Sequence, residues 1–391
     1  MAHGRSLADI DPVAARDLVR RLSVRPRFAN SSAETDARNI CAGELRAVGF
    51  DVAEEPFAFS EFPGRWAPSL GAVILSAVAF ASAHAAAAHS APAVGLSILV
   101  GGLALLGLGG SWTARYGTTR TPWLRSQSAN LVARRGGTRE RPTTWMVAHI
   151  DSKSQTVPML ARIASVVLSI AMFALLIVVI GFAALNTGTA PGSIAPDLAG
   201  QSLERAISII SWLAIASTIP MILCIVGNRS PGALDNASGV AAVLLAAGLI
   251  DANRHLGVVI TSAEELGLAG ARAHVAMNPG GGTALNCDTI DDRGAFIGMT
   301  RGMSGRSALA EALTRAAATR KVSIRIRGML PGVFADNVAF TDAGWDSLTL
   351  SRGNIATLAR VHTAGDRPDD IDGAGIAEAA RLLAATIEEL S

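Results

Sequence analysis

Two long apolar stretches interrupt an otherwise mixed pattern of hydrophobic and polar positions. Residues 66–113 contain no Asp, Glu, Lys or Arg, and residues 157–227 contain only Arg162, Asp197, Glu204 and Arg205. A helix that crosses a bilayer needs about 20 mostly apolar residues, because hydrocarbon offers the backbone no alternative hydrogen-bond partner. The pattern therefore predicts four membrane-spanning helices, which cover residues 70–88, 94–112, 163–185 and 206–226.

The rest of the chain alternates short apolar runs typical of strands with periodic runs typical of helices. Strands are predicted at 143–150, 256–263, 283–287 and 322–326. Helices are predicted at 239–250, 267–276, 307–319 and 376–390. This alternation predicts an α/β fold with a mixed, mostly parallel sheet flanked by helices. We expect one discontinuous domain, formed by residues 1–65, 114–156 and 228–391, with two inserted transmembrane helical hairpins, residues 66–113 and 157–227.

Composition supports this division. Of the 391 residues, 50% are hydrophobic and 17% are charged, and the mean hydropathy of +0.37 is too high for an ordinary soluble globule. Outside the two insertions the charged fraction is about 23%, close to the roughly 25% of a typical soluble domain. The hydrophobicity is therefore confined to the insertions, and both a disordered chain and a simple soluble domain are excluded.

The distribution of charge predicts location and partners. Basic residues flank the predicted spans on the globular side, whereas the far loops carry only Arg205, next to Glu204. By the positive-inside rule we expect an integral, multi-pass plasma-membrane protein whose globular part is cytoplasmic. The N-terminus lacks the apolar core of a secretory signal. With a net charge of +2 and no basic stretch interleaved with aromatics, nucleic acid is not an expected partner.

Candidate chemistry lies at the predicted strand ends. The three cysteines show no CxxC spacing, so a Cys-based zinc site is not predicted. His149 and Asp151 end one strand, and a His-x-Asp pair suits a metal ligand with its orienting carboxylate. Asp235 precedes a helix, where a helix cap is the alternative interpretation. The adjacent pair Glu264 and Glu265 is another candidate, with an exposed acidic turn as the alternative interpretation. Asp288 and His362 are the remaining candidates. Together they suit a two-metal hydrolytic site.

Six segments in this order resemble the M28 family of zinc aminopeptidases. They are VAHIDSKS (147–154), GALDNASGVAAVLLAA (232–247), SAEELGLAGARAHV (262–275), NCDTIDD (286–292), ADNVAFTDAGWDSLTL (335–350) and VHTAGD (361–366). Residues 17–59 are also similar to the opening helices of that family. The resemblance extends over essentially all of the chain outside the membrane segments.

The resemblance implies a role for each candidate residue. His149 and Asp288 would hold one Zn²⁺, and Glu265 and His362 would hold the second. Asp235 would bridge the two ions. Among the same candidates, Asp151 would orient His149 and Glu264 would act as general base. The implied function is that of a membrane-anchored di-zinc metallopeptidase, an aminopeptidase that acts on peptide substrates.

Other interpretations stay open. The family includes glutaminyl cyclases, so an aminoacyltransferase is the alternative enzyme, and a membrane scaffold or transporter with an inert lobe is the alternative outside enzymes. The chain also departs from the family pattern, because Asn337 follows Asp336 where His is common. The hairpin inserted between the His149 and Asp235 motifs is expected to keep the site near the membrane surface, with simple anchoring as the alternative role. No sequence feature specifies an oligomeric state.

Overall fold

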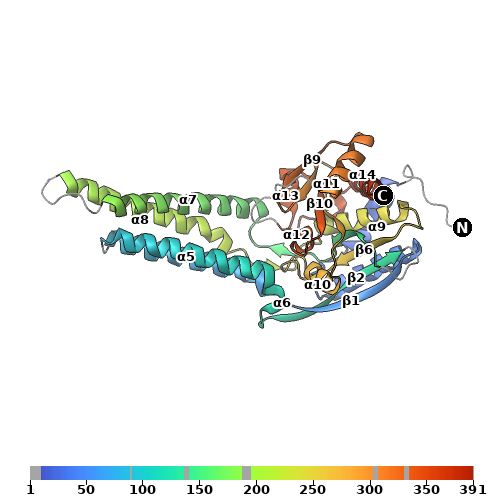
Figure 1. The fold of residues 1–391 in the computed structure, drawn as a ribbon, viewed down its shortest axis with the longest axis horizontal. Helices are drawn as coiled ribbons and strands as arrows, with labels where there is room; N and C mark the ends of the chain where they lie inside the picture. Colours follow the sequence, from blue (N-terminus) through green and yellow to red (C-terminus); the bar gives the residue numbers. More distant parts are fainter. Residues whose placement is uncertain are drawn as a thin grey trace. The chain divides into compact units, whose positions relative to one another are not determined.

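The computed structural model describes residues 10–88, 90–135, 141–186, 195–302, 307–329 and 334–390. Figure 1 shows its helices and strands and labels part of them with the names used below. The chain divides into two compact units. The globular unit comprises Met1–Glu61, Pro122–Ser154 and Gly227–Ser391, and the helical unit comprises Phe62–Thr121 and Gln155–Val226. The turn of the second predicted hairpin, residues 187–194, lies outside the described residues.

An eight-stranded sheet organises the globular unit. Its strand order is β1-β2-β6-β3-β7-β10-β8-β9. The neighbours β6, β3, β7 and β10 are parallel, as are β8 and β9, whereas β1 and β2, β2 and β6, and β10 and β8 are antiparallel. The strands are β1 (Asp51–Ser60), β2 (Arg125–Arg135), β3 (Thr144–His149), β6 (Leu256–Thr261), β7 (Thr283–Ile290), β8 (Ala295–Thr300), β9 (Ile324–Gly328) and β10 (Asp346–Gly353). A separate pair joins β4 (Ser154–Gln155) and β5 (Val226–Gly227). The predicted mixed, mostly parallel sheet is confirmed.

Helices flank the sheet. They are α1 (Pro12–Leu22), α2 (Ser32–Ala47), α9 (Gly239–Leu249), α10 (Ala269–Met277), α11 (Ala308–Thr319), α12 (Asn337–Asp342), α13 (Ile355–Arg360) and α14 (Ala374–Glu389). The short elements η3 (Ala233–Ser238) and η4 (Pro368–Asp370) precede α9 and α14. Helix α9 is apolar on all sides, and all but one of its side chains are buried. A helix of that composition must be covered all round, and α9 indeed contacts β3, β7, α1, α2 and α14.

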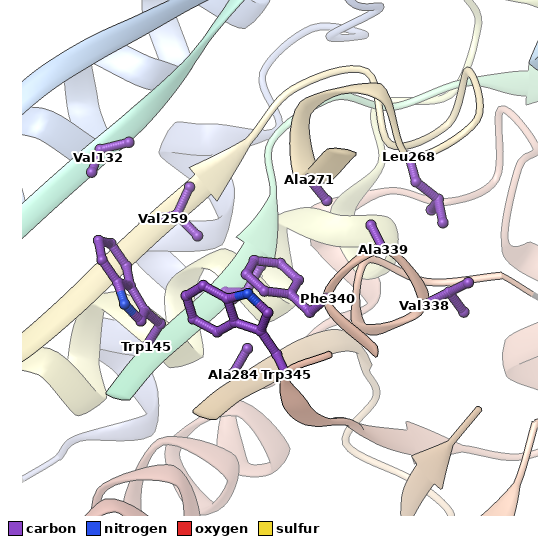
Figure 2. Packing of buried hydrophobic residues seen from close by; sticks show 11 residues of the cluster. Val132, Trp145, Val259, Leu268, Ala271, Ala284, Val338, Ala339, Phe340 and Trp345 are labelled. Atoms are coloured by element: carbon purple, nitrogen blue, oxygen red, sulfur yellow. The ribbon is translucent and has the colours of Figure 1, made fainter. Parts of the chain in front are cut away.

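Aromatic side chains fill the core between the sheet and helices α10 and α12 (Figure 2). The Trp145 side chain from β3 is 1% exposed, and its indole N–H donates to the carbonyl oxygen of Pro142. Phe340 of α12 meets Trp345 edge to face, with ring centroids 5.3 Å apart. Gly257 of β6 makes room for Trp145, because a Cβ there would lie 2.3 Å from the indole ring. This close packing fixes β3 and β6, whose ends carry candidate site residues.

The strands and helices predicted in this unit are present as β3, β6, β7, β9, α9, α10, α11 and α14, with ends shifted by a few residues. The sequence pattern missed β1, β2, β8 and β10. Strand β1 lies at the sheet edge and has mostly exposed or half-buried side chains. An edge strand buries little apolar surface and therefore leaves a weak hydrophobic pattern.

The helical unit contains four helices that are long and apolar enough to cross a membrane: Ala67–Ala87, Pro92–Arg120, Met159–Asn186 and Gly200–Ile222. No more than 28% of each apolar window is buried inside the structure. Apolar side chains thus cover most of the outer surface of these helices, as lipid contact requires. The elements are α3 (Phe62–Arg65), α4 (Ala67–Ala83), η1 (His84–Ala88), α5 (Pro92–Trp112), η2 (Thr113–Gly117), α6 (Thr118–Arg120), α7 (Met159–Asn186) and α8 (Ala195–Ile222).

Small polar side chains connect these helices internally. Ser165 of α7 donates to the carbonyl oxygen of Ser217 in α8, and the hydroxyls of Ser169 and Ser217 lie 2.8 Å apart. Ser76 of α4 and Thr218 of α8 are joined in the same way, at 2.7 Å. Hydroxyls that pair across helices are typical of membrane helix packing, where polar groups find no water.

Candidate metal centre

The candidate residues at strand ends lie on neighbouring strands. His149 is the last residue of β3, and Glu264 and Glu265 follow the adjacent strand β6. Asp288 lies near the end of β7, on the other side of β3. Because these strands are parallel, their carboxyl ends meet at one edge of the sheet, where α/β proteins bind ligands. The order of strands therefore brings together side chains that are far apart in the sequence.

Two loops complete the centre. Asp235 lies in η3, just before α9, and His362 follows α13 with a left-handed φ of 62°. The first triad consists of His149, Asp235 and Asp288, and the second triad consists of Asp235, Glu265 and His362. In each triad, one potential ligand atom from every residue lies within 4.8 Å of the others, and all these residues are buried.

Asp235 is shared by both triads. Its Oδ1 lies 3.2 Å from His149 Nε2, and its Oδ2 lies 3.0 Å from His362 Nε2. Burial alone would raise the pKa of Asp235, but the two imidazoles outweigh burial and lower it. One carboxylate thus turns a separate oxygen toward each triad, which is the arrangement that a bridging ligand needs.

The donor atoms of both triads fit Zn²⁺. They are imidazole nitrogens and carboxylate oxygens, the ligand types that zinc takes from His, Asp and Glu. Glu265 Oε1 is buried and lies 3.0 Å from His362 Nε2. A buried carboxylate oxygen is costly unless a hydrogen-bond donor or a cation stabilises it. His362 and a metal ion could each do so.

Glu264 lies beside the first triad but belongs to neither of the two triads. Its Oε2 is 4.0 Å from His149 Nε2. Burial raises the pKa of Glu264 well above its usual value, and Glu265, Asp336 and Asp288 add to this effect against the opposing influence of His149. A carboxyl group with a raised pKa can both take and return a proton near neutral pH.

Asp151 holds the strand ends together. Its Oδ1 accepts the backbone N–H of Glu264 at 3.1 Å, and its Oδ2 accepts that of Glu265 at 3.2 Å. The Nδ1 atom of His149 lies 3.0 Å from the backbone carbonyl oxygen of Asp151 and 3.5 Å from its carboxylate. The carbonyl oxygen is thus the nearer partner of the ring, while the carboxylate fixes the turn that carries both glutamates.

Lys153 neutralises one oxygen of Glu265. Its Nζ lies 2.7 Å from Glu265 Oε2, which leaves Oε1 on the side of His362. Burial opposes ionisation of Glu265, but His362 and Lys153 together lower the pKa of this carboxyl to about 2. Glu265 is therefore ionised and presents a single oxygen to the second triad.

Sequence reasoning did not identify Asp366 as a site residue, although it lies in the VHTAGD segment. Its carboxylate accepts the backbone N–H groups of Leu234 at 2.7 Å and Asp235 at 3.1 Å. Burial raises the pKa of Asp366 to about 7. Asn236 anchors the same loop to β7, because its Nδ2 donates to the carbonyl oxygen of Cys287 at 3.0 Å. Together these bonds position Asp235.

The Asp336-Asn337 pair, where the sequence departs from the pattern of the family it resembles, is fully buried. The Asp336 carboxylate accepts a hydrogen bond from the Thr261 hydroxyl, and Thr261 pairs with His149 across β6 and β3. Asn337 Nδ2 donates to the carbonyl oxygen of Met299 at 3.3 Å. In this chain the asparagine therefore binds the backbone of β8.

Glu34 supports the glutamate turn and was also missed by the sequence pattern. Its side chain is fully buried, its Oε1 accepts a hydrogen bond from the Ser262 hydroxyl, and its Oε2 accepts one from the backbone N–H of Asn30. Ser262 lies two residues before Glu264. Burial, with a smaller contribution from Asp151, raises the pKa of Glu34 to about 7.

Substitution Glu34→Gln is expected to change how stability depends on pH. A carboxyl whose pKa is raised by folding contributes stability below its unfolded pKa, and that contribution is lost as the pH rises through the folded pKa of about 7. An amide does not titrate. Between pH 5 and pH 8 the wild type should therefore lose about 2 kcal/mol more stability than the variant. Chemical denaturation of the chelator-treated protein at pH 5 and pH 8 measures the loss of stability in each protein. An equal loss in the wild type and the variant would contradict the prediction.

Comparison with known proteins agrees with this geometry. Residues 218–387 match the family model described as Peptidase family M28. None of the curated proteins matches the chain by sequence.

Solved structures share the fold. An aminopeptidase from Aneurinibacillus sp. strain AM-1 has a TM-score of 0.56 and 13% identity, with 97% of this chain and 94% of that chain covered. A zinc aminopeptidase from Bacillus subtilis has a TM-score of 0.55 and 15% identity, covering 98% and 96%. The Fimbriiglobus ruber glutaminyl cyclase has a TM-score of 0.54 and 14% identity, covering 99% and 97%. The family match over residues 218–387, the shared fold and the buried His–carboxylate cluster together support a metallopeptidase of family M28.

Proposed function

We propose that this chain is a membrane-anchored di-zinc aminopeptidase that releases amino acids from the N-terminus of peptides. The observation that carries the proposal is the pair of triads that share Asp235, with the carboxyl group of Glu264 beside them. Two metal positions with a common carboxylate and a nearby acid–base group are the components of metal-assisted hydrolysis.

The first triad would hold one zinc ion and the second triad the other, with Asp235 common to both. When bound, the ions supply Lewis-acid polarisation of the scissile carbonyl and increase the acidity of water. The chain supplies the remaining components. Asp151 fixes the turn that carries Glu264 and Glu265, and Asp366 fixes the loop that carries Asp235.

Glu264 is the proposed general base and acid. It takes a proton from the attacking water as the new bond forms between oxygen and the carbonyl carbon. It then gives that proton to the amide nitrogen as the C–N bond breaks, so that the products are a carboxylic acid and an amine. Its raised pKa suits both steps, because the group must change protonation state twice in each cycle.

The choice of aminopeptidase rests on the fold neighbours. Two of the solved structures with this fold are described as aminopeptidases, one of them as a zinc aminopeptidase. A substrate with a free N-terminus is therefore the one proposed for this site.

The four apolar helices would anchor the protein as two hairpins, residues 66–113 and 157–227. The basic residues that flank them favour a cytoplasmic globular unit. A reporter fused after Ser391 should then be active only in the cytoplasm, and activity outside would reverse the proposed orientation.

One experiment tests the activity. The purified protein, kept in detergent, is expected to contain two zinc ions per chain and to release free amino acids from a panel of unblocked peptides. A chelator should abolish the release, added Zn²⁺ should restore it, and N-acetylated peptides should resist cleavage. Cleavage of acetylated peptides would contradict the aminopeptidase assignment.

Product analysis separates the alternatives. A glutaminyl cyclase would convert N-terminal glutamine to a pyroglutamyl peptide without releasing an amino acid, and the structural likeness to such an enzyme makes this assay worthwhile. Tightly bound metal with neither product would favour a scaffold or transporter with an inert lobe.

A further inference from the structure

A buried arginine lies outside the six segments that carry the candidate site residues. Arg27 is in the segment between α1 and α2, and its side chain is 0% exposed. Its guanidinium group donates hydrogen bonds only to backbone carbonyl oxygens among the described residues. They are those of Ile150 at 2.8 Å, Leu22 at 3.0 Å, Pro231 at 2.5 Å and Gly232 at 2.9 Å.

Three of these carbonyl oxygens belong to the two loops that carry metal-ligand candidates. Ile150 lies between His149 and Asp151, and Pro231 and Gly232 come directly before the element that contains Asp235. One planar, rigid side chain therefore spans both loops. Arginine suits this position because its fork of N–H donors has a fixed geometry.

Ser152 makes a second connection between the same loops. Its hydroxyl accepts the backbone N–H of Arg27 at 2.9 Å and donates to the carbonyl oxygen of Ser230 at 3.0 Å. Its own backbone N–H donates to the carbonyl oxygen of Arg27 at 3.0 Å. The contact is close, because a Cβ on Gly232 would lie 2.5 Å from the Cβ of Ser152.

The same two loops are also tied where the long insertion joins the globular unit. The chain leaves the globular unit after Ser154 and returns at Gly227, so a long insertion separates the two loops. The pair β4–β5 and the hydrogen bond from the Arg229 backbone N–H to Ser154 Oγ, at 3.0 Å, hold the two ends of the insertion together. Arg27 connects the same two loops at Ile150, Pro231 and Gly232, next to the ligand candidates in the sequence.

We propose that Arg27 is a positioning residue that clamps the His149 and Asp235 loops together and thereby sets the metal affinity of the first triad. The effect on metal affinity rests on the proposed function, whereas the clamp itself does not. The hydrogen bonds of Arg27 go to the backbone of the two loops and not to a candidate ligand side chain, so the clamp acts on the ligands through the backbone.

Arg135 provides a matched control. It too is buried, and it too donates to four backbone carbonyl oxygens, those of Val48, Ala247, Ile250 and Asp251, at 2.8–3.2 Å. None of those residues belongs to the candidate metal centre. Arg27→Met and Arg135→Met therefore remove comparable buried networks, one next to the centre and one away from it.

Two measurements on the full-length protein in detergent test the proposal. In the metal-free protein, Arg27→Met should make the backbone amides of Ser152 and residues 233–235 exchange with deuterium at least about tenfold faster, and Arg135→Met should not. In competition with a chelator, Arg27→Met should weaken zinc binding by about 10- to 100-fold, the usual cost of losing an outer-shell partner. Arg135→Met should bind zinc as the wild type does, even if both variants melt at a lower temperature.

The outcomes are distinguishable. Unchanged amide exchange or wild-type zinc affinity in a folded Arg27→Met would overturn the proposal. If that variant does not fold, Arg27→Lys keeps the charge but loses the fork, and it should show the same two changes to a smaller extent. If the wild type itself binds no zinc, the proposed function fails, and the exchange measurement still decides whether Arg27 clamps the loops.

Discussion

Substitution Glu264→Gln is expected to reduce peptide hydrolysis by about 10²- to 10⁴-fold, the range that general acid–base groups contribute. The amide has nearly the same shape but cannot take a proton from water. Glu264 belongs to neither triad, and its backbone N–H, which donates to Asp151, is unaffected by the change. Zinc content and affinity should therefore stay at the wild-type level. The measurements are kcat on an unblocked peptide and metal analysis of the same sample.

Glu265→Gln is the control for this result. The two residues are adjacent, both are buried, and both changes replace one carboxylate with an amide. Glu265, however, lies 3.0 Å from His362 in the second triad. Its substitution should lower the zinc content, whereas that of Glu264 should lower only turnover. Substantial activity in a fully zinc-loaded Glu264→Gln would refute its role as general base.

Much of the candidate site could be predicted because its residues follow strand ends. His149, Glu264 and Asp288 end predicted strands, and the carboxyl ends of parallel strands meet at one edge of a sheet. The structure brings His149, Asp288 and Glu265 together with Asp235 and His362 in two triads, and Glu264 lies beside the first of them. The sequence placed the chemistry without specifying distances, because distances depend on strand order, which no local pattern encodes.

The supporting residues could not be predicted for a different physical reason. Arg27, Asp366 and Glu34 act on loops far away in the sequence, and two of them bind those loops mainly through backbone atoms. Backbone groups carry no residue identity, so such contacts leave no partner to recognise in the sequence. An arginine in an ordinary polar segment is expected to be exposed. Only its complete burial in the folded chain reveals its importance.

The helical unit shows the opposite case, in which the sequence was almost sufficient. A run of apolar residues long enough to cross a bilayer requires no knowledge of tertiary contacts. The predicted spans 94–112 and 163–185 fall within the helices Pro92–Trp112 and Met159–Asn186. What the runs did not reveal is the set of hydroxyl contacts between α7 and α8, because isolated serines in an apolar helix have several possible partners.

Substitution Asp235→Asn should have the largest effect on metal binding. Asp235 directs Oδ1 toward His149 and Oδ2 toward His362, and an asparagine would replace one of these anionic oxygens with an NH₂ group that cannot bind a cation. We expect the zinc content to fall from two ions per chain to one or fewer, and zinc affinity to fall by more than about 100-fold, beyond the cost of losing an outer-shell partner.

Asp291→Asn is the matched control for this substitution. Asp291 is a buried aspartate just beyond β7, and its carboxylate accepts hydrogen bonds from Thr357 and Arg293 outside both triads. It should keep both ions while losing some stability. Metal analysis after dialysis against a weak chelator separates the two variants. Retention of two tightly bound ions by Asp235→Asn would show that the shared carboxylate does not bridge them, and the metals would then have to be held by the remaining residues of each triad alone.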